Sequence, residues 1–418
     1  MKKNLLLTSI LALLLASCSF APQRVKKEGE IDIVSAFENQ TELKVSQLGK
    51  TIRYVPLETN DSSLVGGAWN IHLLDDKILV SCKEANMLFD RQTGMFLCKV
   101  SGVGQGPQEY TQGNYTPYIH PQTGDIYFNR TPNKMIGFNQ EGKFIGELAL
   151  PVNWHDQCYL TFDDDQAILH VMSNNQRLYR FGADAQVTDS IVLPSFGREI
   201  VNDDFLSASH FVANSGKMFG LGIFSCNGML VAKYKSGERM DLIPTRYPSL
   251  YHYHDEIRFH EACSDTVFSI EGNQLSPRWI FHTGEYHFPM ERYGEMKESL
   301  NYIAVTYAVE NDRILFFQCA KGLFSGFKEV QLCNAIYQKK DGTLLMNNAK
   351  EGFTDDLTHF MPFHPEDFTQ KGEYIGALNV VKIQKWLEAH PETKLEGALA
   401  PLAGLADDAN PVVVIVEP

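Results

Sequence analysis

Short apolar segments recur along the chain in a constant order and at a nearly constant spacing. The first unit contains Asp76–Val80, Met87–Asp90 and Gly94–Leu97. The next unit repeats this order, and three apolar positions match between the two: Ile78 with Ile126, Phe89 with Phe138, and Phe96 with Phe144. Their common offset of about 48 residues lies in the range that is typical of propellers and solenoids. Such a chain is expected to stack similar units against one another.

Four weaker copies bring the number of units to six. They begin at Ala167–Leu169, Lys217–Phe219, Glu256–Phe259 and Arg313–Phe316. Short β-branched and aromatic segments alternate in each unit with turns that contain glycine, such as Asp341-Gly342. A single four-stranded sheet would expose two apolar faces, whereas a ring of sheets covers both. An open solenoid needs shorter and more regular coils, so we predict an all-β fold, a six-bladed β-propeller.

Both ends of the repeat region carry segments that would close such a ring. Thr51–Leu57 and Asn410–Val416 each have the pattern of a buried strand. We predict that one or both complete a blade from the opposite terminus, because a closed ring brings the two ends of the chain together. The apolar positions of Ala377–His390 fit a helix, and we expect this short C-terminal helix to pack against an end of the ring.

The first residues are typical of an exported protein. A basic start at Met1–Asn4 precedes the apolar run Leu5–Leu15, which is about half as long as a transmembrane helix. The run ends in Leu15-Ala16-Ser17-Cys18, which resembles the lipobox of bacterial lipoproteins, whose cysteine is acylated. We predict a signal peptide over residues 1–17, a lipid-anchored flexible tether over 18–38 and the propeller over 39–418. The protein would then be an outer-membrane lipoprotein held to the membrane through Cys18, facing the periplasm or the cell surface.

Charge and cysteine content argue against two classes of function. The formal net charge of −14 leaves no basic stripe that could neutralise phosphates, so a nucleic-acid partner is not expected. Lipidation of one of the eight cysteines leaves an odd number, and no Cys-x-x-Cys spacing indicates a zinc or redox site. One or two disulfides could still form in an oxidising compartment.

Four pieces of the chain carry a resemblance to a known family. They are Tyr54–Thr59, Gly102–Tyr110, Ser264–Ile270 with Leu275–Pro277, and Asn410–Val413. Together they resemble the six-bladed β-propeller lipoproteins of unknown function, and the Gly-Gln-Gly-Pro-x-Glu-Tyr piece is similar to turns of NHL-type propellers. The resemblance spans nearly the whole mature chain. It implies the fold and the envelope location but no reaction, because the family has no established catalytic residues to transfer.

No motif for catalysis, a metal or a cofactor is present. Gly102–Gly106 lacks the Lys-Ser/Thr of a phosphate-binding loop and leads into Pro107, so a tight turn between blades is the better interpretation. Gly-x-Ser-x-Gly is absent, and His260-Glu261 lacks the second histidine of a zinc protease helix. We therefore assign no catalytic residue, no metal ligand and no cofactor.

The most unusual polar cluster provides the candidate ligand-binding residues, which are Tyr251, His252, Tyr253, His254 and Arg258. On a strand, His252 and His254 would point to the same face and could form a metal pair or, with the tyrosines, a platform for a sugar ring. The alternative is a connection between blades whose aromatic rings pack on their neighbours.

These features favour a binding or interaction module over an enzyme. Loops at one end of the ring would hold a glycan, a peptide or a partner protein. The alternatives are a lyase or hydrolase with a polar site in the central channel, and a scaffold attached to an outer-membrane transporter. Convergent His, Asp, Glu or Arg side chains from three or more blades would favour catalysis, whereas a channel lined with aromatic rings would favour binding.

Overall fold

The structure is a computed structural model that describes residues 28–66, 69–82, 85–102, 104, 106–109, 117–130, 134–150, 158–163, 166–171, 177–182, 184–192, 223–226, 229–233, 240–244, 250–260, 264–287, 301–322 and 330–418. Cys18, the predicted signal peptide and residues 18–27 of the predicted tether lie outside these ranges. No helix in the described ranges is long and apolar enough to cross a membrane.

The strands form seven sheets, and within the repeats each sheet is built from consecutive antiparallel strands. The first two sheets contain β3 (Trp69–Leu73), β4 (Lys77–Cys82), β5 (Ala85–Asp90) and β6 (Phe96–Gly102), then β7 (Tyr118–Ile119), β8 (Ile126–Arg130), β9 (Lys134–Phe138) and β10 (Phe144–Ala149). The next two contain β11 (Cys158–Asp163), β12 (Gln166–Val171), β13 (Arg177–Phe181) and β14 (Val187–Val192), then β15 (Ile223–Cys226), β16 (Met229–Lys233) and β17 (Met240–Pro244).

The last three sheets follow in chain order, and the final one also takes a strand from the beginning of the chain. They contain β18 (Leu250–Tyr253), β19 (Glu256–His260), β20 (Thr266–Glu271) and β21 (Gln274–His282), then β22 (Ile303–Glu310), β23 (Ile314–Lys321), β24 (Gln331–Gln338) and β25 (Leu344–Asn348). The closing sheet contains β26 (Asp367–Phe368), β27 (Tyr374–Leu378), β28 (Val412–Glu417) and β2 (Thr51–Pro56).

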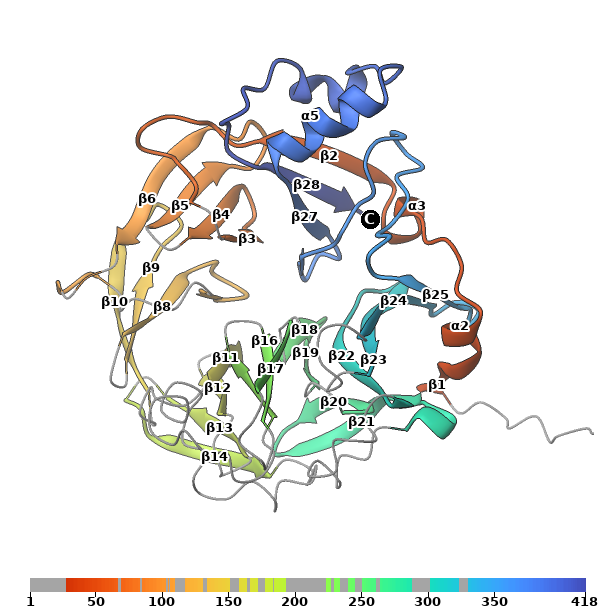
Figure 1. The fold of residues 1–418 in the computed structure, drawn as a ribbon. Helices are drawn as coiled ribbons and strands as arrows, with labels where there is room; N and C mark the ends of the chain where they lie inside the picture. Colours follow the sequence, from red (N-terminus) through yellow and green to blue (C-terminus); the bar gives the residue numbers. More distant parts are fainter. Residues whose placement is uncertain are drawn as a thin grey trace, which may run out of the picture.

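The sheets are arranged around a common centre, with β3, β22 and β27 towards the centre and β6, β25 and β2 at the rim (Figure 1). This arrangement confirms the predicted all-β propeller. Neighbouring sheets touch through their inner strands, because β7 contacts β11 and β27 contacts β3. In the first two sheets the predicted repeat corresponds to the second, third and fourth strands, and Phe89 and Phe138 are matching buried positions on β5 and β9.

Six blades were predicted, but the described strands form seven sheets of unequal size, so the predicted number is wrong. Five of the described sheets have the four strands of a regular blade, one has three, and one has five because β1 (Glu30–Asp32) adds to β21. The fourth predicted unit contributes β16 to the three-stranded sheet, and its Lys217–Phe219 segment lies outside the described residues. The three-stranded sheet does not separate its neighbours in the chain, since β11 contacts β18 directly and Ile191 packs with Phe259.

The two terminal segments close the ring as predicted. β28 lies between β2 and β27 and is antiparallel to both, with Val414 opposite Tyr54 on one side and Gly376 on the other. The Asn410 side chain stabilises the corner of this sheet, because its amide nitrogen donates hydrogen bonds to the carbonyls of Glu58 (2.6 Å) and Ser63 (2.7 Å). Two of the pieces that carry the family resemblance therefore meet at the seam of the ring, the pairing of β2 with β28.

The folded body begins earlier than the predicted boundary at residue 39. β1 pairs in parallel with β21, and α2 (Val34–Glu38) follows it directly. Ile31 and Ile33 are buried, as is Phe37 on the inner side of α2. The alternating apolar residues of this segment are buried in the core, although its many charges suggested a flexible tether. α3 (Val45–Leu48) then leads into β2.

The C-terminal helix is α5 (Val380–Ala389), and it begins after Asn379, whose side chain accepts a hydrogen bond from the Val381 amide. Val380 and Ile383 belong to the same apolar cluster as Val414, so the helix packs on the closing sheet. Figure 1 shows α5 beside β28 at the outer rim of the ring. Two short 3₁₀ helices complete the described elements, Gly284–Tyr286 and Gly397–Leu402.

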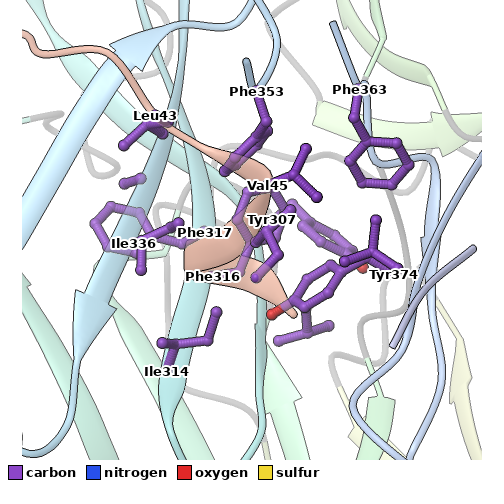
Figure 2. Packing of buried hydrophobic residues seen from close by; sticks show 14 of the residues in the cluster. Leu43, Val45, Tyr307, Ile314, Phe316, Phe317, Ile336, Phe353, Phe363 and Tyr374 are labelled. Carbon is purple, nitrogen blue, oxygen red and sulfur yellow. The ribbon is translucent and has the colours of Figure 1, made fainter. Parts of the chain in front are cut away.

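Aromatic side chains fill the space between neighbouring sheets. Phe316 on β23 contacts Tyr374 on β27 edge to face, with 5.7 Å between the ring centres. Phe353 packs on the Phe316 ring, with 6.1 Å between the ring centres. Figure 2 shows these residues together with Leu43 and Val45 from the N-terminal segment. This packing makes sheet β22–β25, the closing sheet and the segment before β2 one continuous core.

The four cysteines whose side chains are described are Cys82, Cys98, Cys319 and Cys333, and none of them forms a disulfide. Cys319 and Cys333 lie opposite each other on β23 and β24.

Candidate functional site

The predicted ligand-binding cluster does not form one site. His254 and Asp255 form the two-residue turn between β18 and β19, in which Tyr253 pairs with Glu256. His254 has a positive φ of 51° and an exposed side chain that bonds to Asp312 at 2.7 Å. Because this residue is in a turn and not on the strand, it does not share a face with His252, so the metal pair considered for these two histidines does not form.

Arg258 has a structural role at the contact between two sheets. Its side chain is 1 % exposed and donates from Nε to Glu310 Oε1 at 2.8 Å and from Nη1 to Ser269 Oγ at 2.7 Å. Lys339 and Trp279 both donate to the other Glu310 oxygen, at 2.5 Å and 3.1 Å. Every partner comes from the protein itself, so Arg258 is not available to a ligand.

The tyrosines of the cluster also join these sheets. Lys339 Nζ lies 4.1 Å from the centre of the Tyr253 ring, and burial lowers the pKa of this lysine. Burial raises the pKa of Tyr251, whose hydroxyl lies 3.5 Å from Glu310. The alternative interpretation of the sequence, a connection whose aromatic rings pack on their neighbours, therefore describes Tyr253, His254 and Arg258. Tyr251 and His252 have a second environment, because they also line the cavity described next.

A cavity of about 330 Å³ lies where four sheets converge on the centre of the ring. The inner strands β3, β7, β18 and β26 line it, together with the turns that follow β3, β7 and β26. In antiparallel sheets these turns all lie at the same end of the ring. Its volume is in the range of pockets for small molecules.

A histidine and a carboxylate from two different sheets meet at this cavity. His72 on β3 places Nδ1 2.8 Å from Oδ2 of Asp367 on β26, and the two side chains are 18 % and 21 % exposed. The carboxylate can only accept, so Nδ1 carries the proton. His72 Nε2 is buried and has no hydrogen-bond partner among the described residues. A buried polar atom of this kind is costly to leave unpaired and often marks a functional position.

The charged side chains around the cavity pair with one another. Arg91, in the turn after β5, is buried and bonds to Glu373 at the start of β27 and to the carbonyl of Leu74 (3.1 Å). Lys371 and Asp75 form a more exposed pair at 2.7 Å. These contacts join the closing sheet to sheet β3–β6, so the groups that hold the ring together also form the wall of the cavity.

His120 is a further histidine of the wall. Its Nδ1 accepts hydrogen bonds from the backbone amides of Gln122 (3.2 Å) and Thr123 (3.4 Å). Burial lowers the pKa of its imidazole, with a smaller opposing effect of Asp125. No group of three or more His, Cys, Asp or Glu side chains in the described ranges has the geometry of a metal site.

Four residues of the cavity wall were not predicted from the sequence: His72, Asp367, Arg91 and Glu373. The units of the repeat were defined from their second to fourth strands, whereas the cavity is lined by the first strands and by the turns. The available signal was His72 itself, which lies between the two buried residues of this segment, Ile71 and Leu73.

The glycine-rich segment that resembles NHL-type turns begins at the end of β6, and none of its described residues is part of the lining of the cavity. Glu109 accepts a hydrogen bond from the Gly106 amide at 2.8 Å, and Arg130 donates to the Pro107 carbonyl at 2.6 Å. These contacts agree with a tight turn, the interpretation preferred from the sequence; Tyr110 lies outside the described residues.

One solved structure supports the fold, and two others are more distant. The chain is similar to a protein from Bacteroides fragilis that is described as exported, with 13 % identity, 93 % of this chain and 99 % of the other covered, and a TM-score of 0.60. A member of the DUF4221 family from Bacteroides vulgatus has 8 % identity over 88 % of this chain and 96 % of its own, with a TM-score of 0.45. BamB from Moraxella catarrhalis has 10 % identity over 72 % and 78 %, with a TM-score of 0.30.

No curated protein matches the chain. One family model does match it, over residues 28–164 and 157–417, and its description is a domain of unknown function, DUF4934. The two segments together cover most of the chain and nearly all of the described body. The chain therefore belongs to the DUF4934 family.

Proposed function

We propose that the protein is an extracytoplasmic binding protein that holds a small, uncharged polar molecule in the cavity at one end of its propeller. The observation that carries this proposal is a cavity built from the inner strands and turns of four sheets, with the His72–Asp367 pair in its wall. A volume of about 330 Å³ suits a sugar or a short peptide better than part of a folded protein. The mutual pairing of Arg91 with Glu373 and of Lys371 with Asp75 favours a ligand without charge.

The proposed location is the outer membrane, with attachment through an acylated Cys18. Leu15-Ala16-Ser17-Cys18 supports this proposal, as does the likeness to a Bacteroides fragilis protein described as exported. Metabolic labelling with palmitate tests it: the label is expected on the wild-type protein and not on Cys18→Ala. Labelling of both proteins, or of neither, would contradict the anchor.

A ligand screen tests the binding function. Thermal unfolding of the mature protein is measured with neutral disaccharides, sugar acids, dipeptides and amino acids, on the wild type, His72→Ala and His254→Ala. We expect at least one compound to raise the midpoint of the wild type and of His254→Ala, because His254 lies in an exposed turn, but not that of His72→Ala. A screen without any shift, or a shift that His72→Ala retains, would reject the cavity as the binding site.

The second candidate function is an enzyme, a lyase or hydrolase, with His72 as general base. The specific observation in its favour is the same pair, because a carboxylate on Nδ1 orients a histidine for proton transfer, a role that requires the buried Nε2 to become exposed when a substrate binds. A bound compound that the wild type converts, and that Asp367→Asn binds without converting, would establish this function. A third outcome, co-purification with an outer-membrane transporter without any small ligand, would favour the scaffold.

A further inference from the structure

We infer that Cys319 and Cys333 form a disulfide bond in the mature protein, and that this bond is made before the core around it is assembled. The two cysteines lie on β23 and β24, and neither lines the proposed binding cavity. The inference uses the proposed extracytoplasmic location, because disulfides form and persist in oxidising compartments, but it does not depend on the proposed ligand.

The backbone brings the two cysteines face to face. Cys319 and Cys333 are directly opposite in the antiparallel pairing of β23 with β24, so their side chains project from the same side of the sheet. In the same register the Lys339 amide donates to the Arg313 carbonyl at 3.0 Å. Hydrogen-bonded positions alternate along a pair of strands, and Cys319 is an even number of residues from Arg313, so the two cysteines also occupy a hydrogen-bonded position.

The spacing of this position suits a disulfide. The Cα atoms of a hydrogen-bonded antiparallel pair are about 5.5 Å apart. Disulfides join Cα atoms that are about 4.4–6.8 Å apart, so a bond between these two residues fits the paired strands. Among the four cysteines whose side chains are described, no other two are opposite each other, because Cys82 pairs with Trp69 and Cys98 with Leu88.

The structure has both side chains as free thiols, in contact with each other and closed off from solvent. The Cys319 thiol donates a hydrogen bond to the Cys333 sulfur, and this bond lowers the pKa of Cys333. Gln40 Nε2 donates to the same sulfur at 3.3 Å. Cys333 is therefore the thiol that more readily becomes a thiolate, the reactive form in disulfide chemistry.

The surroundings of the pair determine when the bond can form. Both cysteines belong to the apolar core that sheet β22–β25 shares with the closing sheet, and the N-terminal segment reaches Cys333 through Gln40. An oxidant in solution cannot reach sulfur atoms in this core. The bond must therefore form after β23 has paired with β24 but before the N-terminal segment packs against them. The same burial then protects the bond from reductants.

The reaction is a thiol–disulfide exchange with an organic disulfide as the oxidant. The Cys333 thiolate attacks one sulfur of the oxidant, whose S–S bond breaks and releases one thiol. The Cys319 thiolate then attacks the Cys333 sulfur, and the remaining half of the oxidant leaves as a second thiol. The protein loses two protons and two electrons, and the oxidant gains both.

Refolding tests the bond directly. The mature chain is reduced and unfolded in urea, refolded with reduced glutathione alone or with a mixture of reduced and oxidised glutathione, and then alkylated in urea. Trypsin cuts after Lys321 and Lys328, so the peptides Ile314–Lys321 and Glu329–Lys339 separate unless a disulfide joins them. We expect joined peptides from the mixture and separate, alkylated peptides from reduced glutathione alone. Separate peptides from both would overturn the inference.

The order of events is tested on the folded, reduced protein. The chain refolded with reduced glutathione alone is transferred to the mixture without urea, and the joined peptides are followed over time. We expect them to appear at least about tenfold more slowly than during refolding in the mixture, because the thiols must first be exposed by local unfolding. Equal rates would show that the core does not have to assemble after the bond.

Variants test the consequence for stability. The thermal midpoint of the wild type should be higher for the oxidised than for the reduced preparation, because the bridge closes a loop of about 15 residues in the unfolded chain. Cys319→Ala should abolish this difference, whereas Cys82→Ala, at another buried cysteine, should retain it. A difference that persists in Cys319→Ala would assign the bond to other cysteines and overturn the inference. A ligand screen without any shift would reject the binding function and leave this bond unaffected.

Discussion

Outside the cavity, His260 is the clearest case of a single buried polar side chain that affects the stability of this protein. Its side chain is buried at the end of β19, with Nε2 3.1 Å from the carbonyl of Ser264. Burial lowers the pKa of this imidazole from 6.5 to about 4. The folded protein therefore keeps His260 neutral at pH values at which the unfolded chain is already protonated.

This difference predicts a loss of stability in mild acid. Between pH 6.5 and 4 the unfolded state binds one more proton at His260, so the free energy of unfolding falls as the pH is lowered through this window. The loss attributable to His260 is at most about 3 kcal/mol. Urea unfolding across this range should show a steeper pH dependence for the wild type than for His260→Gln, and the difference between the two proteins removes the contribution of the carboxylates. Parallel curves would contradict the prediction.

The residues of the candidate site also show what a sequence can and cannot reveal. The polar cluster around His252 was visible, but the sequence does not reveal that His254 adopts a positive φ, which is unusual for a residue other than glycine. The role of Arg258 depends on Glu310, 52 positions later, and the partner of His72 is 295 positions away. Such pairs arise from ring closure and have no local signature.

Among the elements, the hairpin turns were the easiest to predict, because glycine marks them. Gly94, between β5 and β6, has a φ of +72°, and Gly342, between β24 and β25, has a φ of +73°. Their surroundings differ. A Cβ atom on Gly94 would lie 2.0 Å from the carbonyl oxygen of Pro56 in the closing sheet, whereas one on Gly342 would have no neighbour closer than 3.5 Å.

The two glycines predict different losses in the free energy of unfolding when each is replaced by alanine. Gly342→Ala should lower the free energy of unfolding by about 1 kcal/mol, the cost of the left-handed backbone alone. Gly94→Ala should add a further penalty of about 1–3 kcal/mol, because the backbone of the neighbouring sheet must move. Chemical denaturation of both variants measures the difference, and equal costs would show that the first sheet and the closing sheet do not press on each other at this turn.

The innermost strands were the elements that the sequence did not reveal. β7 and β26 have two residues each, too few for any periodicity to be detected. The N-terminal β1 was missed for another reason: the charges of the preceding residues dominate the composition, although Ile31 and Ile33 alternate as on a strand. Composition describes a segment on its own, whereas β1 is stabilised by its pairing with β21.

The whole molecule depends on closure of the ring, which was predicted from the two apolar terminal segments. The number of sheets was not predicted correctly, because the closing sheet is separate from the six units of the repeat. Closure also builds the candidate site, since Asp367 belongs to the closing sheet and His72 to the sheet beside it. Stability and ligand binding should therefore be lost together when the seam is opened.

Removal of β28 opens the seam. Residues Val412–Val416 are all buried, and loss of their contacts forfeits about 1.5–3 kcal/mol for each side chain, a sum comparable with the whole stability of an ordinary domain. The chain lacking Val412–Pro418 is expected to show no cooperative unfolding transition and no distinct His72 signal in the NMR spectrum. The chain lacking only Pro418, which follows the last strand and is exposed, should match the wild type. A cooperative transition near the wild-type midpoint in the longer deletion would mean that the remaining sheets hold the ring without its last strand, and that the His72–Asp367 pair owes its geometry to something other than closure.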